Sequence, residues 1–279
     1  MRTDLTDLFF AAVYGCFAQS GVIPSDASHV SAADRAALLE AVCPGHVTER
    51  GCSTCPGASF STEPWELESI TLGHFLAAAS EDAFASGVGC EPHVNLFGGS
   101  YLLTKDRSHW RKVWYIPGAR ADDCKKLTGS DRRDRLVCDA SDMHQGFASE
   151  FLYLLDPGQK PGEQGIDPHG VFFNVPDSVG ECQVDTHGML VSGKIESVAF
   201  VPASPAPSVR IVATARLGKA TIPPEILESL ESCGRARLAT VSRKYEFLFD
   251  GNRVVPSQAN PPMAGFEALA PETSYSVAK

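Results

Sequence analysis

The sequence predicts a mainly β protein: antiparallel blade-like repeats forming a small or partial β-propeller or a sandwich, with two short helices and disulfide staples. First, short apolar or alternating runs fill residues 90–156 and are separated by Gly, Asp, Ser and Pro, which is typical of strands joined by tight turns. Second, cysteines are spread through most of the chain. Third, helical spacing of apolar residues is found in only two short stretches.

One pair of cysteines specifies a strand pairing. Cys124 and Cys138 flank a turn centred on Asp131. Two antiparallel strands paired about that centre place Cys124 opposite Cys138 and Lys126 opposite Leu136. Directly opposed residues have neighbouring Cβ atoms, so the spacing predicts a cross-strand disulfide.

The N-terminal residues 1–18 predict a signal peptide. The apolar run LFFAAVYGCFA ends in small residues, which suits cleavage after Ala18. Arg2 is offset by Asp4 and Asp7, so a buried N-terminal helix is the alternative, and a lipid anchor on Cys16 is a third. No apolar run reaches the roughly 18–20 residues that span a bilayer, so we expect no transmembrane segment.

Cysteine number favours an extracytoplasmic location, periplasmic or secreted. Cleavage would remove Cys16 and leave eight of the nine cysteines, an even number that suggests disulfides in an oxidising compartment. Proximity along the chain predicts a second bridge between Cys182 and Cys233. The remaining four are expected to pair among themselves: Cys43, Cys52, Cys55 and Cys90.

The mature chain divides into five further segments. Residues 19–60 hold a helix and a cysteine-rich loop; Ser31 is the expected N-cap, with Asp34 at the capping-box position. Residues 61–156 hold the β repeat units, 157–170 form a loop and the internal boundary, and 171–256 form a second β half. That half contains a short helix at 221–234 and a closing hairpin turned at Asp250-Gly251. Residues 257–279 read as an extended tail.

Two units about 50 residues long echo one another. Each has an acid-led strand (82–86 and 134–138), a Gly-containing loop, and an apolar strand ending in Asp (101–106 and 151–156), and 245–250 echoes the last of these. With the lead 73–75, this layout resembles degenerate FG-GAP or VCBS-type repeats, the blade units of integrin-α-like β-propellers. The calcium loop of that family is absent here, so calcium does not follow. The chain also resembles uncharacterised exported bacterial proteins, which implies no activity.

The residues Cys43, His46, Cys52 and Cys55 form the most compact set of soft ligands. Their side chains could enclose a tetrahedral zinc. In an oxidising compartment the same cysteines would form disulfides, which we expect instead. A redox-active Cys52–Cys55 pair is the remaining alternative.

A basic and aromatic stretch stands out from the acidic chain. The net charge is −10, yet residues 105–135 hold ten Lys or Arg and five Asp. Such a surface could bind a polyanion or glycan, or an envelope protein, whereas the overall charge argues against nucleic acid as a partner. The alternative is the solvated face of a hairpin pair with Trp110 or Trp114 in the core. The candidate residues are Arg107, Trp110, Arg111, Lys112, Trp114, Lys125 and Lys126.

Four aspartates surround one predicted hairpin: Asp131, Asp134, Asp139 and Asp142. Loop carboxylates could hold calcium. We expect instead that the neighbouring arginines at 132, 133 and 135 neutralise them, and we expect no cofactor.

The eight histidines are scattered, and none belongs to a recognised catalytic motif. His74, His93 and His144 fall in loops beside predicted strands, where backbone contacts are the expected role. The sequence therefore favours an exported, non-enzymatic binding or structural module of the cell envelope. Its rivals are a hydrolase or lyase using loop His and acid residues, and a zinc-stabilised module. A His paired with an acid in a deep pocket would favour the enzyme.

Overall fold

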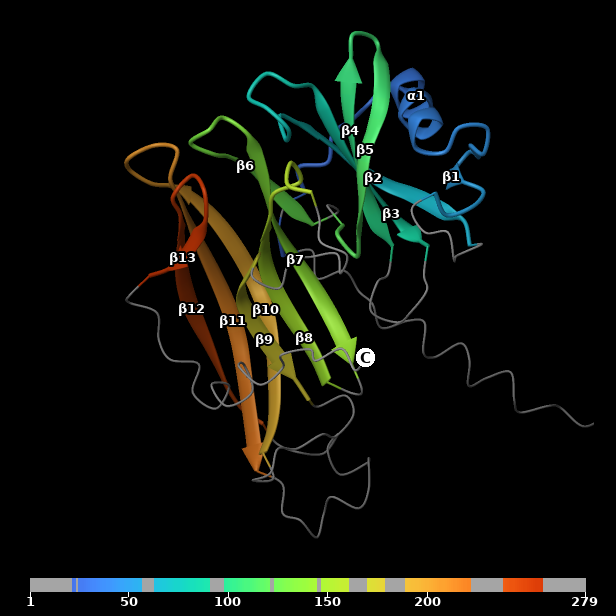
Figure 1. Ribbon diagram of the computed structural model, residues 1–279. Helices are drawn as coiled ribbons and strands as arrows, with labels where there is room; N and C mark the ends of the chain where they lie inside the picture. The colour runs from blue at the N-terminus through green and yellow to red at the C-terminus, as the bar shows by residue number, and fades with distance from the viewer. Residues whose placement is uncertain are drawn as a thin grey trace, which may run out of the picture.

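The computed structural model describes residues 22–23, 25–56, 63–90, 98–120, 123–144, 147–160, 170–178, 189–221 and 238–257. Within these residues the strands form three antiparallel sheets that follow one another along the chain (Figure 1). In each sheet, consecutive strands are neighbours. The predicted fold class, mainly β with antiparallel pairing and disulfides, is confirmed.

The strand bounds follow the chain in order. The first sheet contains β1 (Gly51–Cys52), β2 (Trp65–Gly73), β3 (Asp82–Gly89), β4 (Gly99–Asp106) and β5 (His109–Pro117). The central sheet contains β6 (Cys124–Thr128), β7 (Asp134–His144), β8 (Phe147–Leu155) and β9 (Val171–Asp177). The third sheet contains β10 (Met189–Pro202), β11 (Val209–Thr221), β12 (Ala239–Phe249) and β13 (Val254–Pro256).

The three sheets stack as layers, and the central sheet is covered on both faces. Leu136 and Cys138 of β7 pack with Phe84 of the first sheet. Val137, which points the other way, packs with Ile211 of the third sheet. Because successive strand residues point to opposite faces, this alternation places the central sheet between the other two.

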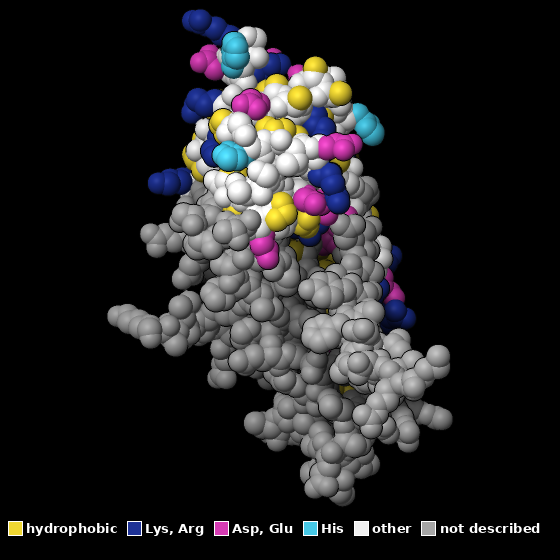
Figure 2. Space-filling view, turned by 90° about the vertical axis from the view of Figure 1, so that its right-hand side faces the viewer, with side chains coloured by type: hydrophobic (Ala, Val, Ile, Leu, Met, Phe, Trp, Pro, Cys, Tyr) yellow, Lys and Arg dark blue, Asp and Glu magenta, His cyan; other side chains and the backbone are white. Residues whose placement is uncertain are grey.

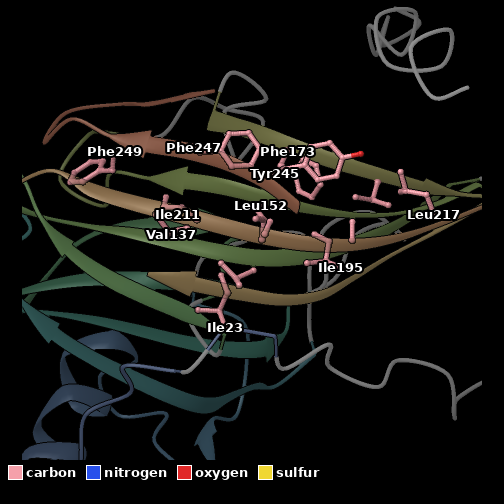
Figure 3. Packing of buried hydrophobic residues seen from close by; sticks show 14 of the residues in the cluster. Ile23, Val137, Leu152, Phe173, Ile195, Ile211, Leu217, Tyr245, Phe247 and Phe249 are labelled. Carbon is pink, nitrogen blue, oxygen red and sulfur yellow. The ribbon is translucent and has the colours of Figure 1, made fainter. Parts of the chain in front are cut away.

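Aromatic rings fill the space between the central and third sheets (Figure 3). The ring of Phe173 on β9 lies 4.9 Å from that of Tyr245 and 5.4 Å from that of Phe247, centroid to centroid. Ile23, from the segment before the first helix, joins the same cluster. Rings of this size bury large apolar areas, so this cluster holds the two sheets together.

Helix α1 (Ala32–Val42) covers the outer face of the first sheet. Its predicted N-cap is confirmed: the backbone N–H of Asp34 donates to Ser31 Oγ, and Ser31 Oγ donates to the Asp34 carboxylate. Leu38, Leu39 and Val42 are buried in the cluster that contains Trp65 and Tyr101. The second predicted helix, at 221–234, lies outside the described residues except for Thr221, which ends β11.

The described residues contain three disulfides: Cys43–Cys52, Cys55–Cys90 and Cys124–Cys138. The last is the predicted cross-strand bridge, and Lys126 pairs with Leu136 as the predicted register requires. The first two join the four N-terminal cysteines among themselves, as expected. Cys16, Cys182 and Cys233 lie outside the described residues, as does the predicted signal peptide.

The three apolar segments ending in Asp occupy equivalent places. Segments 101–106, 151–156 and 245–250 each belong to the strand before the last in their sheet, β4, β8 and β12. At the following turn Asp156 accepts the N–H of Gly158, and Asp250 accepts the N–H groups of Asn252 and Arg253. The turn chemistry explains the Asp at these positions, while descent from FG-GAP or VCBS-type units stays a prediction.

The loop expected as the internal boundary, 157–170, does not separate two sheets. Strand β9 follows it and pairs with β8, so both sides of the loop belong to the central sheet. The chain passes to the third sheet only after β9. Pro and Gly residues in a sequence carry no information about which strands pair on either side of them.

The stacked core predicts a large cost for truncating Phe173, which is 4% exposed. We expect Phe173→Ala to lower the free energy of unfolding by about 3–5 kcal/mol, through lost burial and a cavity. Urea denaturation measures the change. As a control, Leu248→Ala removes a side chain that is 38% exposed and is expected to cost about 0.5 kcal/mol or less. Equal effects of the two substitutions would contradict the layered core.

Candidate functional site

The predicted zinc set is occupied by disulfides. Cys43 is bonded to Cys52, and Cys55 to Cys90, so none of these sulfurs is a thiolate that could bind a metal. The redox-active pair Cys52–Cys55 is not formed either. His46 stays exposed. The disulfides that we expected in place of zinc are therefore the ones that the structure has. No group of three or more metal-binding side chains occurs in the described part of the chain.

The predicted basic and aromatic surface is divided between two faces of β5. A bulge separates the pair Leu102–Trp114 from the pair Leu103–Lys112. Trp110 consequently packs with the cluster under α1, whereas Trp114 packs toward the central sheet, where its indole N–H donates to Pro157 O at 3.1 Å. Both tryptophans are partly buried, which matches the alternative interpretation of this stretch.

The lysines of the same stretch have separate local partners. Lys112 Nζ donates to Val42 O at the end of α1 and lies 5.6 Å from the ring centroid of Tyr101. Lys125 pairs with Asp26 at 2.7 Å, and Lys126 donates to Leu72 O at 2.7 Å.

Arg107 and Arg111 are exposed. On the face that carries α1, cationic and anionic side chains are interspersed (Figure 2). The structure therefore does not gather the seven predicted residues into one binding surface.

Arginines bind Asp131 of the β6–β7 hairpin and Asp156 at the end of β8. Arg135, which is 3% exposed, donates to both oxygens of Asp131 at 3.0 Å. Arg133 donates to Asp131 and, through two nitrogens, to Asp156 at 3.0 and 2.8 Å. Bidentate pairs of this kind are geometrically specific, and they favour the predicted neutralisation over calcium.

This ion-pair network also joins the tips of the three sheets. Arg133 Nη1 donates to Phe75 O in the loop between β2 and β3. Ser130 N donates to Gly251 O at 2.9 Å in the turn between β12 and β13. Asp134 accepts the N–H of His74 at 2.9 Å. The contacts named above do not involve Asp139. The side chain of Asp142 lies outside the described residues.

Acid should weaken this network. The hydrogen bond from Arg135 is the main reason that the pKa of Asp131 is far below its usual range, helped by Arg133. A depressed folded-state pKa contributes stability above the unfolded-state pKa of about 3.9, and this contribution is lost as the pH falls toward the folded-state value. We expect Asp131→Asn to destabilise at pH 7 and the difference from wild type to shrink progressively below pH 4, measured by urea denaturation. Asp106→Asn, at an exposed turn, is the control, and a pH-independent difference for Asp131→Asn would contradict the assignment.

The histidines do not assemble a catalytic site among the described residues. His74 Nδ1 contacts Ser80 O within its own loop, which is the backbone role expected for it. His93 and the side chain of His144 lie outside the described residues. The condition that favours the enzyme, a loop His beside an acid in a pocket, is not met by His74.

An open cavity of about 290 Å³ lies where the central and third sheets meet. It was not predicted from the sequence. Two carboxylates from the central sheet and a set of polar residues from the third sheet line it: Glu150, Asp177, Ser192, Gly193, Lys194, Arg216, Gly218 and Thr240.

One wall of the cavity forms where the free edge of β10 approaches the central sheet. Among the described strands, β10 pairs only with β11. On the other side, Ser178 N donates to Val191 O at 2.8 Å, and Ile195 N donates to Glu150 Oε2 at 2.6 Å. A Cβ on Gly193 would lie 2.2 Å from Val175 Cγ1. Glycine is therefore required here, because only it lets the two strands approach so closely.

The carboxylates and the cations that line the cavity differ in how far they are exposed to solvent. Burial raises the pKa of Glu150; the Ile195 N–H and Lys194 oppose this rise, and Asp177 adds to it. Asp177 Oδ2 accepts from Ser192 Oγ at 3.0 Å. Lys194 is exposed, and Arg216 is 55% exposed with its Nε 3.3 Å from Glu196. The carboxylates are thus less exposed than the cations.

The sequence pattern around Glu150 indicates that this residue is unusual. It shares a face of β8 with Leu152 and Leu154, which pack into the core between the sheets. A carboxylate on an apolar strand face is expensive unless it is paired or functional. The alternation of residues 148–154 could therefore have identified it.

Comparison with known proteins found no protein-family model, curated protein or solved structure that matches this chain. No helix in the described ranges has the length and apolarity needed to cross a bilayer. The three disulfides fit an extracytoplasmic location.

The raised pKa of Glu150 predicts the direction in which protein stability changes with pH. When the pKa of an acid is higher in the folded state than in the unfolded state, the acid destabilises the fold as the pH rises above its unfolded-state pKa. Glu150→Gln keeps an oxygen that can accept from Ile195 N but removes the charge. We expect the variant to be as stable as wild type near pH 4 and more stable at pH 7.5, measured by urea denaturation. Glu49→Gln, an exposed loop position, is the control. A variant that is less stable at pH 7.5 than at pH 4, relative to wild type, would contradict this account.

Proposed function

We propose that this protein is an exported binding module of the cell envelope, and that it binds a small polar ligand in the cavity lined by Glu150 and Asp177. One observation carries the proposal: Glu150 accepts the backbone N–H of Ile195 on β10, and burial raises the pKa of the Glu150 carboxyl. A glutamine at this position could accept the same hydrogen bond without a buried charge. Strained or perturbed groups of this kind concentrate at functional sites. The cavity volume is at the small end of those that hold ligands.

The composition of the cavity favours binding over turnover. No His or Cys is among its described lining residues. Ser192 donates its hydroxyl to Asp177, but a carboxylate alone is a weak base for a serine hydroxyl, which normally needs an adjacent imidazole or amine. The residues come from strands of two packed sheets, which suits a preformed binding site.

One observation supports the hydrolase or lyase alternative. Two carboxylates in different environments line the same cavity, and the pKa of Glu150 is raised. Such a pair could supply a general acid and a general base. The binding proposal therefore has to be tested against turnover as well as against absence of a ligand.

Export and oxidation are tested by one mass measurement. We expect the protein expressed in full in a bacterium to be recovered outside the cytoplasm, cleaved after Ala18. Its non-reduced mass should be at least six hydrogens below the thiol form, for Cys43–Cys52, Cys55–Cys90 and Cys124–Cys138, and eight if Cys182 and Cys233 also pair. Reduced thiols in a cytoplasmic form would contradict export.

Binding in the cavity is tested by a ligand screen with a blocked variant. Thr240→Trp fills the cavity from β12, whereas Lys244→Trp places the same side chain at an exposed position of the same strand outside it. Polar small molecules that raise the melting temperature of wild type and Lys244→Trp, but not of Thr240→Trp, would support the proposal. Robust turnover of a substrate in a hydrolase and lyase panel, lost in Glu150→Gln, would replace it with the enzyme.

A further inference from the structure

Strand β12 is covered along only part of one edge. On one side, β11 pairs with it along its whole length, Ala239–Phe249. On the opposite side, β13 pairs only with residues 247–249, and Ser257 N donates to Glu246 O just beyond them. Among the described strands, none pairs with residues 239–245 on that side, and Figure 1 shows β13 beside only one end of β12. The third sheet therefore has a free edge at 239–245.

The backbone of three residues points to this free edge. The hydrogen bond from Ser257 N to Glu246 O shows that the backbone groups of Glu246 point away from β11. The pairing of β12 with β11 runs without a bulge, and backbone groups alternate in direction along an antiparallel strand. The N–H and C=O groups of Thr240, Ser242 and Lys244 therefore point away from β11 as well. They have no partner among the described strands, and such a row of donors and acceptors is a template for another strand.

The length of the free edge suits pairing with a second copy of the chain. Most soluble oligomers are symmetric, and a two-fold axis joins the same surface of both chains. An antiparallel strand pair with this symmetry places one residue opposite itself, and Ser242 is the midpoint of the free edge 239–245. With the axis there, each free edge covers the other. Glu246, where the cover by Ser257 begins, then falls beyond Ala239 of the second copy, so β13 does not obstruct the pairing.

The charges along this edge favour the same axis. With Ser242 opposite itself, Lys244 faces Thr240 of the second copy, and Arg243 faces Val241, so each cation lies opposite an uncharged residue. An axis at Arg243 or Lys244 would place that cation opposite its own copy, and directly opposed like charges destabilise a strand pair. Cations at a sheet edge discourage most pairings, and they leave this register open. Val241, which is 47% exposed, would be partly covered by the aliphatic stem of Arg243.

We propose that this protein forms a symmetric dimer through β12, with the free edges of two copies joined antiparallel about a two-fold axis at Ser242. About six backbone hydrogen bonds form, from the N–H and C=O groups of Thr240, Ser242 and Lys244 in each copy. The third sheets of the two copies then become one continuous sheet. Because a single strand pair makes a small interface, the dimer dissociates on dilution, with a Kd in about the micromolar range. This inference uses the sheet edge alone and does not depend on a ligand in the cavity.

Sedimentation velocity of the full chain at increasing concentration measures the association. We expect a monomer at low concentration and a dimer at high concentration. Ser242→Pro removes a central N–H that points to the free edge and takes no part in the pairing with β11, and it should weaken association about tenfold or more. Ser242→Ala is the matched control, because it loses the same hydroxyl but keeps the N–H, and it should associate like wild type. Circular dichroism and urea denaturation confirm that both variants are folded.

Introduced cysteines test the register. Directly opposed residues of a hydrogen-bonded pair have Cα atoms about 5.5 Å apart, a separation that a disulfide spans. Ser242→Cys should therefore form a cross-linked dimer on mild oxidation, seen on a non-reducing gel. Lys244→Cys alone should not cross-link, but it should do so when it is mixed with Thr240→Cys. Wild type treated in the same way is the control for the cysteines already present.

Any of three outcomes would overturn the inference. A chain that stays monomeric at every concentration excludes the second copy, and slow amide exchange at residues 240, 242 and 244 in that monomer would assign the edge to another segment of the same chain. A dimer that Ser242→Pro leaves unchanged uses a different surface. Equal cross-linking of Ser242→Cys and Lys244→Cys would contradict the axis at Ser242. None of these outcomes bears on the ligand screen, so the proposed binding function stands or fails separately.

Discussion

The structure depends on a central sheet that packs against another sheet on each of its two faces. Antiparallel sheets commonly bury one face and expose the other, but β7 directs Leu136 toward the first sheet and Val137 toward the third. Each outer sheet therefore has its apolar inner face covered by the same four strands. Neither outer sheet could retain its packed inner face without the central one, so the three layers are expected to form a single cooperative core.

A layer buried on both sides leaves the polar groups at its ends and edges to be satisfied. At one end, the Arg133 and Arg135 network pairs the aspartates of the β6–β7 hairpin and contacts the turns of both outer sheets. At the meeting point of β9 and β10, Ser178 and Glu150 satisfy the backbone of the free edge. In the arginine network, each charge is neutralised by a neighbouring side chain. At the junction of β9 and β10, the partly buried carboxylate of Glu150 lies beside a cavity. This difference identifies the cavity, rather than the charge-rich hairpin, as the candidate site.

Much of the local structure could be predicted from the sequence. The Cys124–Cys138 register, the cap at Ser31 and the turn at Asp250 follow from short-range rules, because the interacting residues are close in sequence. The pairing of the four N-terminal cysteines was predicted only as a set, since Cys55 and Cys90 meet through the fold of the first sheet.

The candidate site could not be predicted in the same way. Alternation shows that a residue points to a face but not which layer covers that face, and the bulge in β5 moves Trp114 to the side opposite Trp110. The sequence could therefore not decide whether the stretch rich in Lys and Trp forms one surface or the solvated face of a hairpin with a tryptophan in the core. Glu150 and Ile195 are 45 residues apart, and their contact exists only because the central and third sheets stack.

Hydrogen–deuterium exchange of the backbone amides, followed by mass spectrometry under native conditions, tests the shared central layer most directly. Amides in the centre of β7 and β8 are paired on both sides and covered on both faces, so they should exchange more slowly than those of any other strand and only through global unfolding. Two results would contradict the account. One is exchange in β7 and β8 that is as fast as in β12. The other is an outer sheet that unfolds and refolds independently after the central sheet has unfolded.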